Sequence, residues 1–398
     1  MYFEIKSVNK YSKRVAIIAG IGSVALLLGA CSAGGATSGG TTTQSSGAPS
    51  SGVPQTVIDE LATYSSASKV NYEGKAIDVS SVGGKTVWWV TQYSGNPFLA
   101  TVGSNFKQAM SLIGVKVTEC DGKGNPVDAN NCLRQAVAQK AAAIQMDGPE
   151  PATYANALPE ANAAKIPVLN GAGIDASVPL MSGMAGQSSQ PFGFTGKLAA
   201  DWIINDSKGA ANVLFITTPD VVGSNTEEKD FSARMAETCP NCKVTVKGVT
   251  LANWASDLGP TTSAVLVKDP TINYVVPTFD PITQFVNPAI QQTGKSSTVK
   301  VVSVNGNLAF MQDMASPNSL TKALIGIDLH ALGYIEADQM LRAMTGNTPI
   351  KLAYAPVRVF DSSTVGKLAL TAKAANDSSW YAGTDATSKM FAALWKQG

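Results

Sequence analysis

The stretch VWWVTQYSGNPFLATVG, residues 87–103, contains a strand, a loop and the start of a helix. Val87–Val90 is an uninterrupted apolar run of β-branched and aromatic residues, which is typical of a buried strand. Gln92–Pro97 is polar and includes Gly-Asn-Pro, a turn signal. From Phe98 to Ile113 apolar residues return at helical spacing. The stretch therefore predicts a strand–loop–helix unit with a polar loop at the carboxyl end of the strand.

The alternation of strand and helix continues along the chain. The predicted strands are residues 86–90, 115–119, 143–146, 166–170, 212–217, 243–249, 272–277, 299–304 and 323–327. Such alternation predicts an α/β fold with doubly wound parallel sheets, and the length favours two sheets. Ligands of open α/β sheets lie beyond the carboxyl ends of the strands, so we expect the functional residues in the strand-end loops.

Composition excludes some classes of function. The chain has 398 residues, is 44% hydrophobic and carries 30 Lys+Arg against 29 Asp+Glu. This length suffices for one large core or two domain-sized cores. Because the chain has neither a basic excess nor an acidic tail, we expect no nucleic-acid partner.

The first 52 residues predict export and a membrane tether. Basic residues within positions 6–14 precede an uncharged run, residues 15–28, which has the length of a signal peptide's apolar segment and is short for a membrane span. The following Leu-Gly-Ala-Cys resembles a bacterial lipobox, which implies removal of residues 1–30 and a lipid on Cys31. A plain signal peptide with a chance cysteine is the alternative. Residues 32–52 contain only Ser, Ala, Gly, Thr, Gln and Pro, and predict a flexible linker.

Residues 53–84 form an N-terminal extension before the main fold. In this extension Val57, Ile58, Leu61 and Tyr64 lie at helical spacing and predict one short amphipathic helix. The sequence suggests no function for it.

Four further cysteines predict two disulfides in an oxidising compartment, Cys120 with Cys132 and Cys239 with Cys242. The alternative is a thioredoxin-like redox site at Cys-Pro-Asn-Cys, residues 239–242. That chemistry favours a helix N-terminus directly after a strand, whereas this motif follows a helical run and precedes a strand. A structural clasp is therefore favoured. Because His330 is the only histidine, we expect no zinc site, no other metal site and no His-dependent catalytic triad.

Several short motifs occur in a family-specific order. They are Asn96-Pro97-Phe98 and residues 103–109, 138–144, 165–169, 196–201 and 332–334. Over about residues 85–360 the chain resembles the ribose-binding type of solute-binding protein of bacterial ABC importers, which shares its fold with LacI-like regulators. The resemblance implies two α/β lobes joined by three crossovers and closing by hinge motion. It implies lobe one at 85–190 plus 328–350, and lobe two at 191–327 plus 351–398.

The resemblance also implies a function. It describes an extracytoplasmic, lipid-anchored monomer at the bacterial cell surface or in the periplasm, which captures a sugar or related solute and delivers it to an ABC permease. No cofactor and no catalysis are expected. Two alternatives stay open at this point: a sensory receptor of the same fold, and an exported thiol–disulfide protein using Cys239 and Cys242.

Carried over position by position, the resemblance implies a set of ligand contacts. They are Tyr93, Asn96, Phe98, Asp220, Trp254, Asp280, Asn305 and Asp328. Asn96 would hydrogen-bond a hydroxyl and Phe98 would stack on an apolar face. Sugar binders of this type show Asp-Arg after the fourth strand, where this chain has residues 171–173, Gly-Ala-Gly. Without an arginine fork, a less polar, modified or aromatic-bearing solute fits at least as well as a simple sugar.

Two expectations concern residues outside this set. Trp88 and Trp89 point to opposite sides of their strand, and both are expected in the core. His330 is expected at the surface, at the start of a helix.

Overall fold

The computed structural model describes residues 52–67, 70, 72–175, 178–350 and 354–397. The predicted signal peptide, Cys31 and nearly all of the linker lie outside the described residues. Residues 51–398 form one compact unit. Within the described ranges, no helix is long and apolar enough to cross a membrane.

Lobe one is built on a parallel sheet in the order β3–β2–β4–β5–β6. Its strands are β2 (Thr86–Thr91), β3 (Lys116–Asp121), β4 (Ile144–Asp147), β5 (Val168–Gly171) and β6 (Gly186–Gln187). Its helices are α2 (Pro97–Ser111), α3 (Pro126–Ala138), η1 (Pro151–Tyr154) and α4 (Leu158–Ala163). Trp88 and Trp89 are both buried and belong to different hydrophobic clusters, which confirms that they lie on opposite faces of β2.

Lobe two is built on a sheet in the order β12–β11–β10–β9–β7–β8, in which only β12 runs antiparallel to its neighbour. Its strands are β7 (Asn212–Thr217), β8 (Lys243–Gly248), β9 (Tyr274–Pro277), β10 (Lys300–Asn305), β11 (Thr321–Ile327) and β12 (Val357–Asp361). Its helical segments are α5 (Phe192–Ser207), α6 (Val222–Thr238), η2 (Leu251–Asn253), α7 (Trp254–Lys268), η3 (Asp280–Ile282), α8 (Thr283–Gln292), α9 (Leu308–Met314) and η4 (Val365–Lys367).

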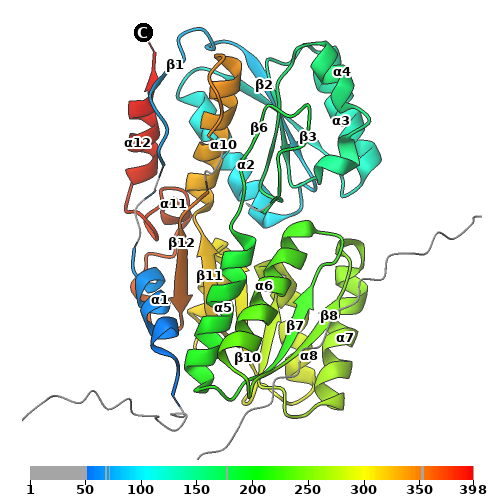
Figure 1. Ribbon diagram of the computed structural model, residues 1–398, viewed down its shortest axis with the longest axis vertical. Helices are drawn as coiled ribbons and strands as arrows, with labels where there is room; N and C mark the ends of the chain where they lie inside the picture. Colours follow the sequence, from blue (N-terminus) through cyan, green and yellow to red (C-terminus); the bar gives the residue numbers. More distant parts are fainter. Residues whose placement is uncertain (1–51, 68–69, 71, 176–177, 351–353, 398) are drawn as a thin grey trace, which may run out of the picture. The chain divides into compact units, whose positions relative to one another are not determined.

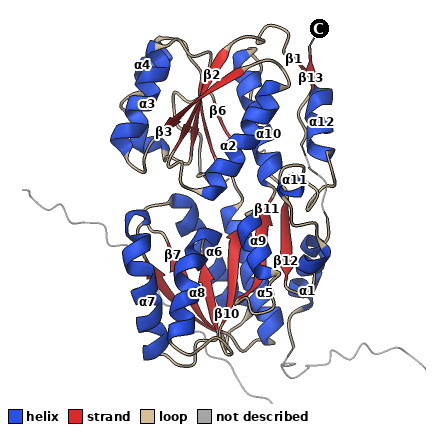
Figure 2. Ribbon diagram, turned by 180° about the vertical axis from the view of Figure 1, so that it is seen from behind, coloured by secondary structure: helices blue, strands red, loops and turns tan. Residues whose placement is uncertain are grey.

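Helices cover both faces of the lobe-two sheet. Along β7, Val213 and Phe215 pack with residues of α5 and α6, whereas Leu214 and Ile216 pack with residues of α7 and α8. Figure 1 shows α5 and α6 in front of the sheet, and Figure 2 shows α7 and α8 on the opposite side. The inner strands β7 and β9 are therefore buried on both faces, which explains why they are nearly continuous apolar runs, whereas the edge strand β8 is largely exposed.

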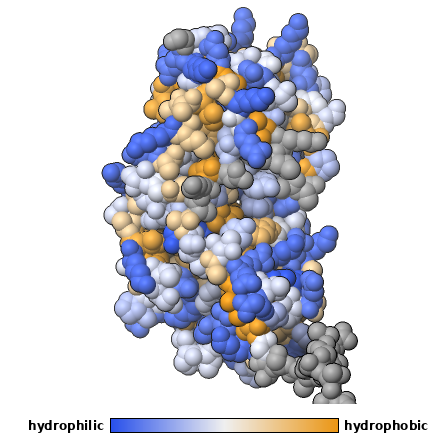
Figure 3. All heavy atoms as spheres, turned by 60° about the vertical axis from the view of Figure 1, so that its left-hand side comes forward, coloured by the Kyte–Doolittle hydropathy of each residue, from blue (hydrophilic) through white to orange (hydrophobic). Residues whose placement is uncertain are grey.

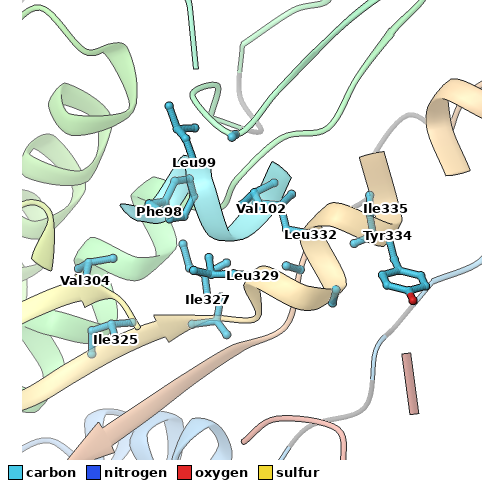
Figure 4. Close-up of a cluster of buried hydrophobic side chains, with 14 of the residues drawn as sticks. Phe98, Leu99, Val102, Val304, Ile325, Ile327, Leu329, Leu332, Tyr334 and Ile335 are labelled. Carbon is cyan, nitrogen blue, oxygen red and sulfur yellow. The ribbon is translucent and has the colours of Figure 1, made fainter. Parts of the chain in front are cut away.

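The described chain passes between the lobes at β6–α5, at β11–α10 and between α10 (Leu329–Met344) and β12. Figure 4 shows the second of these crossovers, where Ile327 ends β11 and Leu329 begins α10. There Phe98 and Val102 of α2 lie in the same buried cluster as Leu329. The helix that follows the first strand thus packs directly on a connection between the lobes.

The two ends of the described chain lie against both lobes. The predicted N-terminal helix is confirmed as α1 (Gln55–Ser65), which contacts α5 and β12 of lobe two. Strand β1 (Ile77–Asp78) then pairs with β13 (Trp395–Lys396). Although the resemblance implied lobe two for all of residues 351–398, α12 (Ala386–Leu394) contacts α10, while α11 (Ala372–Ala375) lies between β12 and α12 in the sequence.

All nine predicted strands are present, with ends shifted by two residues at most. The two predicted disulfides, Cys120–Cys132 and Cys239–Cys242, are also present. On the face drawn in Figure 3, hydrophobic residues form small groups among hydrophilic ones. The buried hydrophobic side chains form four clusters in the interior of the two lobes.

The expectation for His330 is wrong in one respect. His330 does lie in the first turn of a helix, but it is only 1% exposed. Its Nδ1 lies 2.8 Å from Asn105 Oδ1, and its ring packs on Tyr334. Because α10 is packed against both α2 and α12, it has almost no solvent face. Burial lowers the pKa of His330 to about 4, so the ring is neutral at physiological pH.

Candidate functional site

A pocket lies between the lobes at the carboxyl ends of the strands. It is lined from lobe one by Gln92, Asn96, Phe98, Leu99, Gly148, Ala172 and Gly173, and from lobe two by Phe192, Val221, Leu251, Trp254, Phe279, Pro281 and Asn305. Its cavity volume is about 50 Å³. Ligand pockets typically measure roughly 300–1,000 Å³, so the pocket in this structure is smaller than a ligand of ordinary size requires.

Aromatic rings form the lobe-two side of the pocket. The rings of Phe192 and Phe279 meet edge to face with centroids 6.3 Å apart, and Trp254 lies 6.4 Å from Phe279. Phe192 begins α5 and Trp254 begins α7, while Phe279 follows β9. The three rings therefore come from three separate strand-end connections and together offer an apolar, π-rich surface.

A buried hydroxyl network fixes Trp254. The indole Nε1 donates to Thr218 Oγ1 at 3.1 Å. Behind it, Ser224 Oγ accepts from the Thr218 backbone N–H at 2.7 Å and lies 3.0 Å from Thr278 Oγ1. All three hydroxyl residues are fully buried. Because each link of this network holds the next, the ring of Trp254 has a defined orientation at the pocket wall.

Amide side chains form the polar part of the pocket. Asn96 caps α2, where its Oδ1 accepts from the Phe98 N–H at 3.0 Å. This leaves the Asn96 Nδ2 group with no acceptor among the described residues. Asn305 ends β10 with a φ of 117°, a conformation that residues other than glycine rarely adopt. Its buried Oδ1 has no hydrogen-bond partner within the described part of the chain.

Asp280 supports the loop beside Asn305. Its carboxylate accepts from the backbone N–H groups of Gly306 and Asn307 at 3.2 and 2.9 Å, and from the Asn307 side chain at 2.8 Å. Burial raises the pKa of Asp280 to about 7, although these hydrogen bonds and the Asn305 amide act in the opposite direction. Asp280 does not line the pocket, so its observed role is to hold the β10–α9 loop.

At three helix starts around the pocket, one backbone N–H group is bound by a carboxylate of the protein. Glu150 Oε1 accepts from the Val222 N–H at the start of α6 at 3.1 Å, across the cleft between the lobes. Asp175 Oδ2 accepts from the Gly193 N–H in the first turn of α5 at 3.2 Å. Asp220 accepts from the Leu251 N–H at the start of η2 at 3.0 Å. These N–H groups, which could otherwise bind an anion, are therefore already occupied.

Two carboxyl groups are buried together beneath the lobe-one wall of the pocket. Asp147 ends β4 directly before Gly148, and Glu336 projects from α10. Both are fully buried and lie over Gly171. Burial raises the pKa of Asp147 to about 7. Burial and the adjacent Asp147 raise the pKa of Glu336 well above its usual range. Near neutral pH the pair therefore retains a proton.

Comparison with known proteins agrees with this two-lobe architecture. A family model described as periplasmic binding protein domain matches residues 87–348. The chain belongs to this family. No curated protein matches the chain in a sequence search.

Solved structures of this kind share the fold at low sequence identity. One is a sugar ABC transporter from Yersinia enterocolitica subsp. enterocolitica 8081, with a TM-score of 0.67 and 17% identity over 79% of this chain and 96% of that chain. Another is an ABC transporter solute-binding protein from Agrobacterium vitis with bound allitol, with a TM-score of 0.64 and 20% identity over 72% and 98%. A third is a 5-methylthioribose transporter solute-binding protein from Thermotoga lettingae, with a TM-score of 0.62 and 20% identity over 79% and 93%.

As a periplasmic binding protein, the chain has a pocket that includes half of the sequence-predicted site residues. Asn96, Phe98, Trp254 and Asn305 line the pocket together. The other four predicted residues lie outside the lining. The Tyr93 side chain is 48% exposed, Asp220 is bound to the η2 backbone, Asp280 holds a loop, and Asp328 caps α10 through the Ala331 N–H.

Other lining residues were not identified from the sequence. Phe279 immediately precedes Asp280 in a strand-end loop, so the loop position that made Asp280 a candidate applied equally to Phe279. Phe192 follows the two-residue strand β6, which is too short to be recognised from sequence. Within the described ranges, no cluster of three or more His, Cys, Asp or Glu residues could hold a metal ion.

Proposed function

We propose that this periplasmic binding protein is the extracytoplasmic solute receptor of an ABC import system. The observation that carries the proposal is a pocket walled by strand-end loops of both lobes, with crossovers beside it that can act as a hinge. A ligand that contacts both walls stabilises the closed arrangement of the lobes, and closure buries the ligand. The closed receptor would then deliver the solute to a membrane permease.

The class of solute follows from the lining. Aromatic and aliphatic side chains with a few amide groups suit a sugar or related neutral compound, which has both apolar faces and hydroxyl groups. Of the similar structures, one is described as a sugar ABC transporter, one has bound allitol and one is in complex with 5-methylthioribose, which agrees with this class. The protein would release its solute chemically unchanged, because its role is capture and not catalysis.

The location and anchoring of the receptor form part of the same proposal. The basic segment, apolar run and Leu-Gly-Ala-Cys motif support export and a lipid on Cys31. The linker that follows would let a monomeric receptor reach its permease while it stays at the membrane. Metabolic labelling with a radioactive fatty acid tests the anchor: the wild-type chain should incorporate label, and a Cys31→Ser chain should not.

Thermal unfolding against a solute panel tests the receptor function. A ligand present at about 100 times its Kd adds about 2.7 kcal/mol to the free energy of unfolding, which is a shift of several degrees for a chain of this size. Sugars, polyols and their substituted derivatives should include at least one that stabilises the chain and is recovered unchanged. Conversion of that solute to a product would show an enzyme instead.

A thiol–disulfide function receives no support from the geometry. Cys239 follows the C-terminus of α6 and precedes β8, as expected from the sequence. The negative end of a helix dipole disfavours a thiolate, whereas reactive cysteines of this kind occur at helix N-termini. The Cys239–Cys242 disulfide is therefore best explained as a clasp between α6 and β8.

A further inference from the structure

The described residues that line the pocket include no charged side chain. A charged group that enters a closing pocket loses water and regains nothing equivalent from amide and aromatic groups. Ionic solutes in protein sites are usually held by arginine, lysine or carboxylate side chains, in bidentate pairs where the geometry allows. This lining therefore disfavours an ionic solute. The groups around the pocket give one further reason against anions and another against cations.

Anions meet a second obstacle at the helix N-termini. At each of three helix starts, one N–H group that could bind a carboxylate or phosphate is taken, by Glu150 at α6, Asp175 at α5 and Asp220 at η2. An anionic solute would have to displace these carboxylates or approach them closely.

Cations are disfavoured by the way the nearest acidic groups are used. The buried carboxylate of Asp280 is engaged by the β10–α9 loop, and Asp220 is engaged by η2. At the opposite wall, Asn96 uses its Oδ1 to cap α2 and so presents an N–H donor to the pocket. A donor at that position needs an acceptor on the solute, and an ammonium group has none.

The small number of polar side chains in the lining limits how many hydroxyl groups of a solute can form hydrogen bonds there. Polar side chains in the lining are the amides of Gln92, Asn96 and Asn305, whereas the remaining side chains are aromatic, aliphatic or absent. A free sugar would bury several hydroxyl groups, and each one left without a partner is costly. Three amides can satisfy only part of such a molecule. The aromatic rings can instead cover an apolar substituent.

The two kinds of lining are unevenly divided between the lobes. Three of the four aromatic rings, Phe192, Trp254 and Phe279, belong to lobe two, and two of the three amides, Gln92 and Asn96, belong to lobe one. The exceptions are Phe98 of lobe one and Asn305 of lobe two. From this we infer that the pocket selects an uncharged sugar or polyol carrying an alkyl, alkylthio or aryl substituent. The substituent packs on the lobe-two rings, and the hydroxylated edge faces the lobe-one amides. This inference rests on the proposed receptor function and names the class of solute.

Titration calorimetry with matched compounds tests the inference on the full chain purified in detergent. One series is ribose, 5-methylthioribose and ribose 5-phosphate; another is glucose, phenyl β-glucoside and glucuronate. In at least one series the substituted neutral compound should bind tenfold or more tightly than the parent sugar. The charged compound of that series should show no measurable binding.

Variants distinguish packing on the rings from a general hydrophobic preference. Trp254→Leu should weaken binding of the substituted compound more than binding of the parent sugar, and so reduce the preference to a few-fold. Val267→Ala provides the matched control, because Val267 lies on the same helix and is 72% exposed. The control should keep the full preference.

The outcomes separate this inference from the receptor function. If a parent sugar or a charged analogue binds as tightly as its substituted partner, the inferred class is wrong and the receptor function stands. If Trp254→Leu leaves the preference intact, the lobe-two rings do not hold the substituent, and the inference is also wrong. If no compound binds to a chain that still unfolds cooperatively, both proposals fail.

Discussion

Glu150 of lobe one and Val222 of lobe two are hydrogen-bonded across the cleft, with 3.1 Å between the carboxylate Oε1 and the backbone nitrogen. Val222 is the first residue of α6, so the bond satisfies a free N–H at the positive end of the helix dipole. Burial raises the pKa of Glu150, and the hydrogen bond to Val222 opposes that effect. The contact links the two lobes directly and involves no residue of the pocket lining.

Glu150→Ala should weaken ligand binding mainly by speeding dissociation. Loss of one such hydrogen bond costs about 1 kcal/mol, which corresponds to roughly a fivefold increase in Kd. Stopped-flow dissociation measurements provide the test. Glu160→Ala is the control, because Glu160 is an exposed lobe-one acid paired with Arg134 and not with lobe two. Equal dissociation rates for the wild type and the Glu150 variant would show that the contact does not contribute to closure.

Thr218→Val should make the Trp254 side chain more mobile without creating a cavity in the core. Valine matches threonine in shape but removes the acceptor for the Trp254 indole N–H. We expect a several-fold rise in Kd and a changed Trp254 fluorescence spectrum, with a loss of about 1 kcal/mol in the free energy of unfolding. Thr218→Ser keeps the hydroxyl group and should restore affinity. If the valine and serine variants bind equally, the hydrogen bond does not position the ring.

Asp147→Asn should flatten the dependence of stability on pH. Burial raises the pKa of Asp147 from 3.8 to about 7, so between these values the folded chain keeps a proton that the unfolded chain has released. The free energy of unfolding therefore falls as pH rises through this window, by about 1.4 kcal/mol per pH unit for each such proton. Urea unfolding from pH 4.5 to 7.5 measures the slope. An unchanged slope in the asparagine variant would contradict the assignment.

The Cys120–Cys132 disulfide should stabilise lobe one. It joins β3 to α3 and closes a loop with a sequence separation of 12. The chain-entropy estimate for a loop of this length is about 3 kcal/mol. Replacement of both cysteines by serine should lower the free energy of unfolding by up to that amount and leave ligand affinity nearly unchanged. A large loss of affinity at a temperature where the variant is folded would show that the clasp shapes the pocket.

The parallel strands could be predicted from sequence because both faces of each sheet are buried. Strand β7, for example, is apolar and β-branched over most of its length and has the predicted ends. Strands β1, β6 and β13 contain two residues each, and no periodicity can identify a strand so short. Their positions depend on pairing between distant segments, as in the contact of β1 with β13.

The candidate site could be predicted in part. Asn96 and Asn305 were identified through the family resemblance, and both lie at strand ends that border the pocket. Asp220 and Asp280 also follow strands, but their carboxylates bind backbone N–H groups of neighbouring loops. Sequence does not show which polar groups a loop uses for its own structure. Tertiary packing decides which polar groups bind the protein's own backbone and which remain free to bind a ligand.

The proposed receptor mechanism requires a solute that binds between the lobes to draw them together. Single-molecule energy transfer between dyes at positions 127 and 267 tests it most directly, because Val127 of lobe one and Val267 of lobe two are 69% and 72% exposed. We expect a solute that stabilises the chain to shift the population toward higher transfer efficiency, with half of the shift at its Kd. If the solute binds with the same Kd and leaves the distribution unchanged, it does not close the lobes, and the account is wrong.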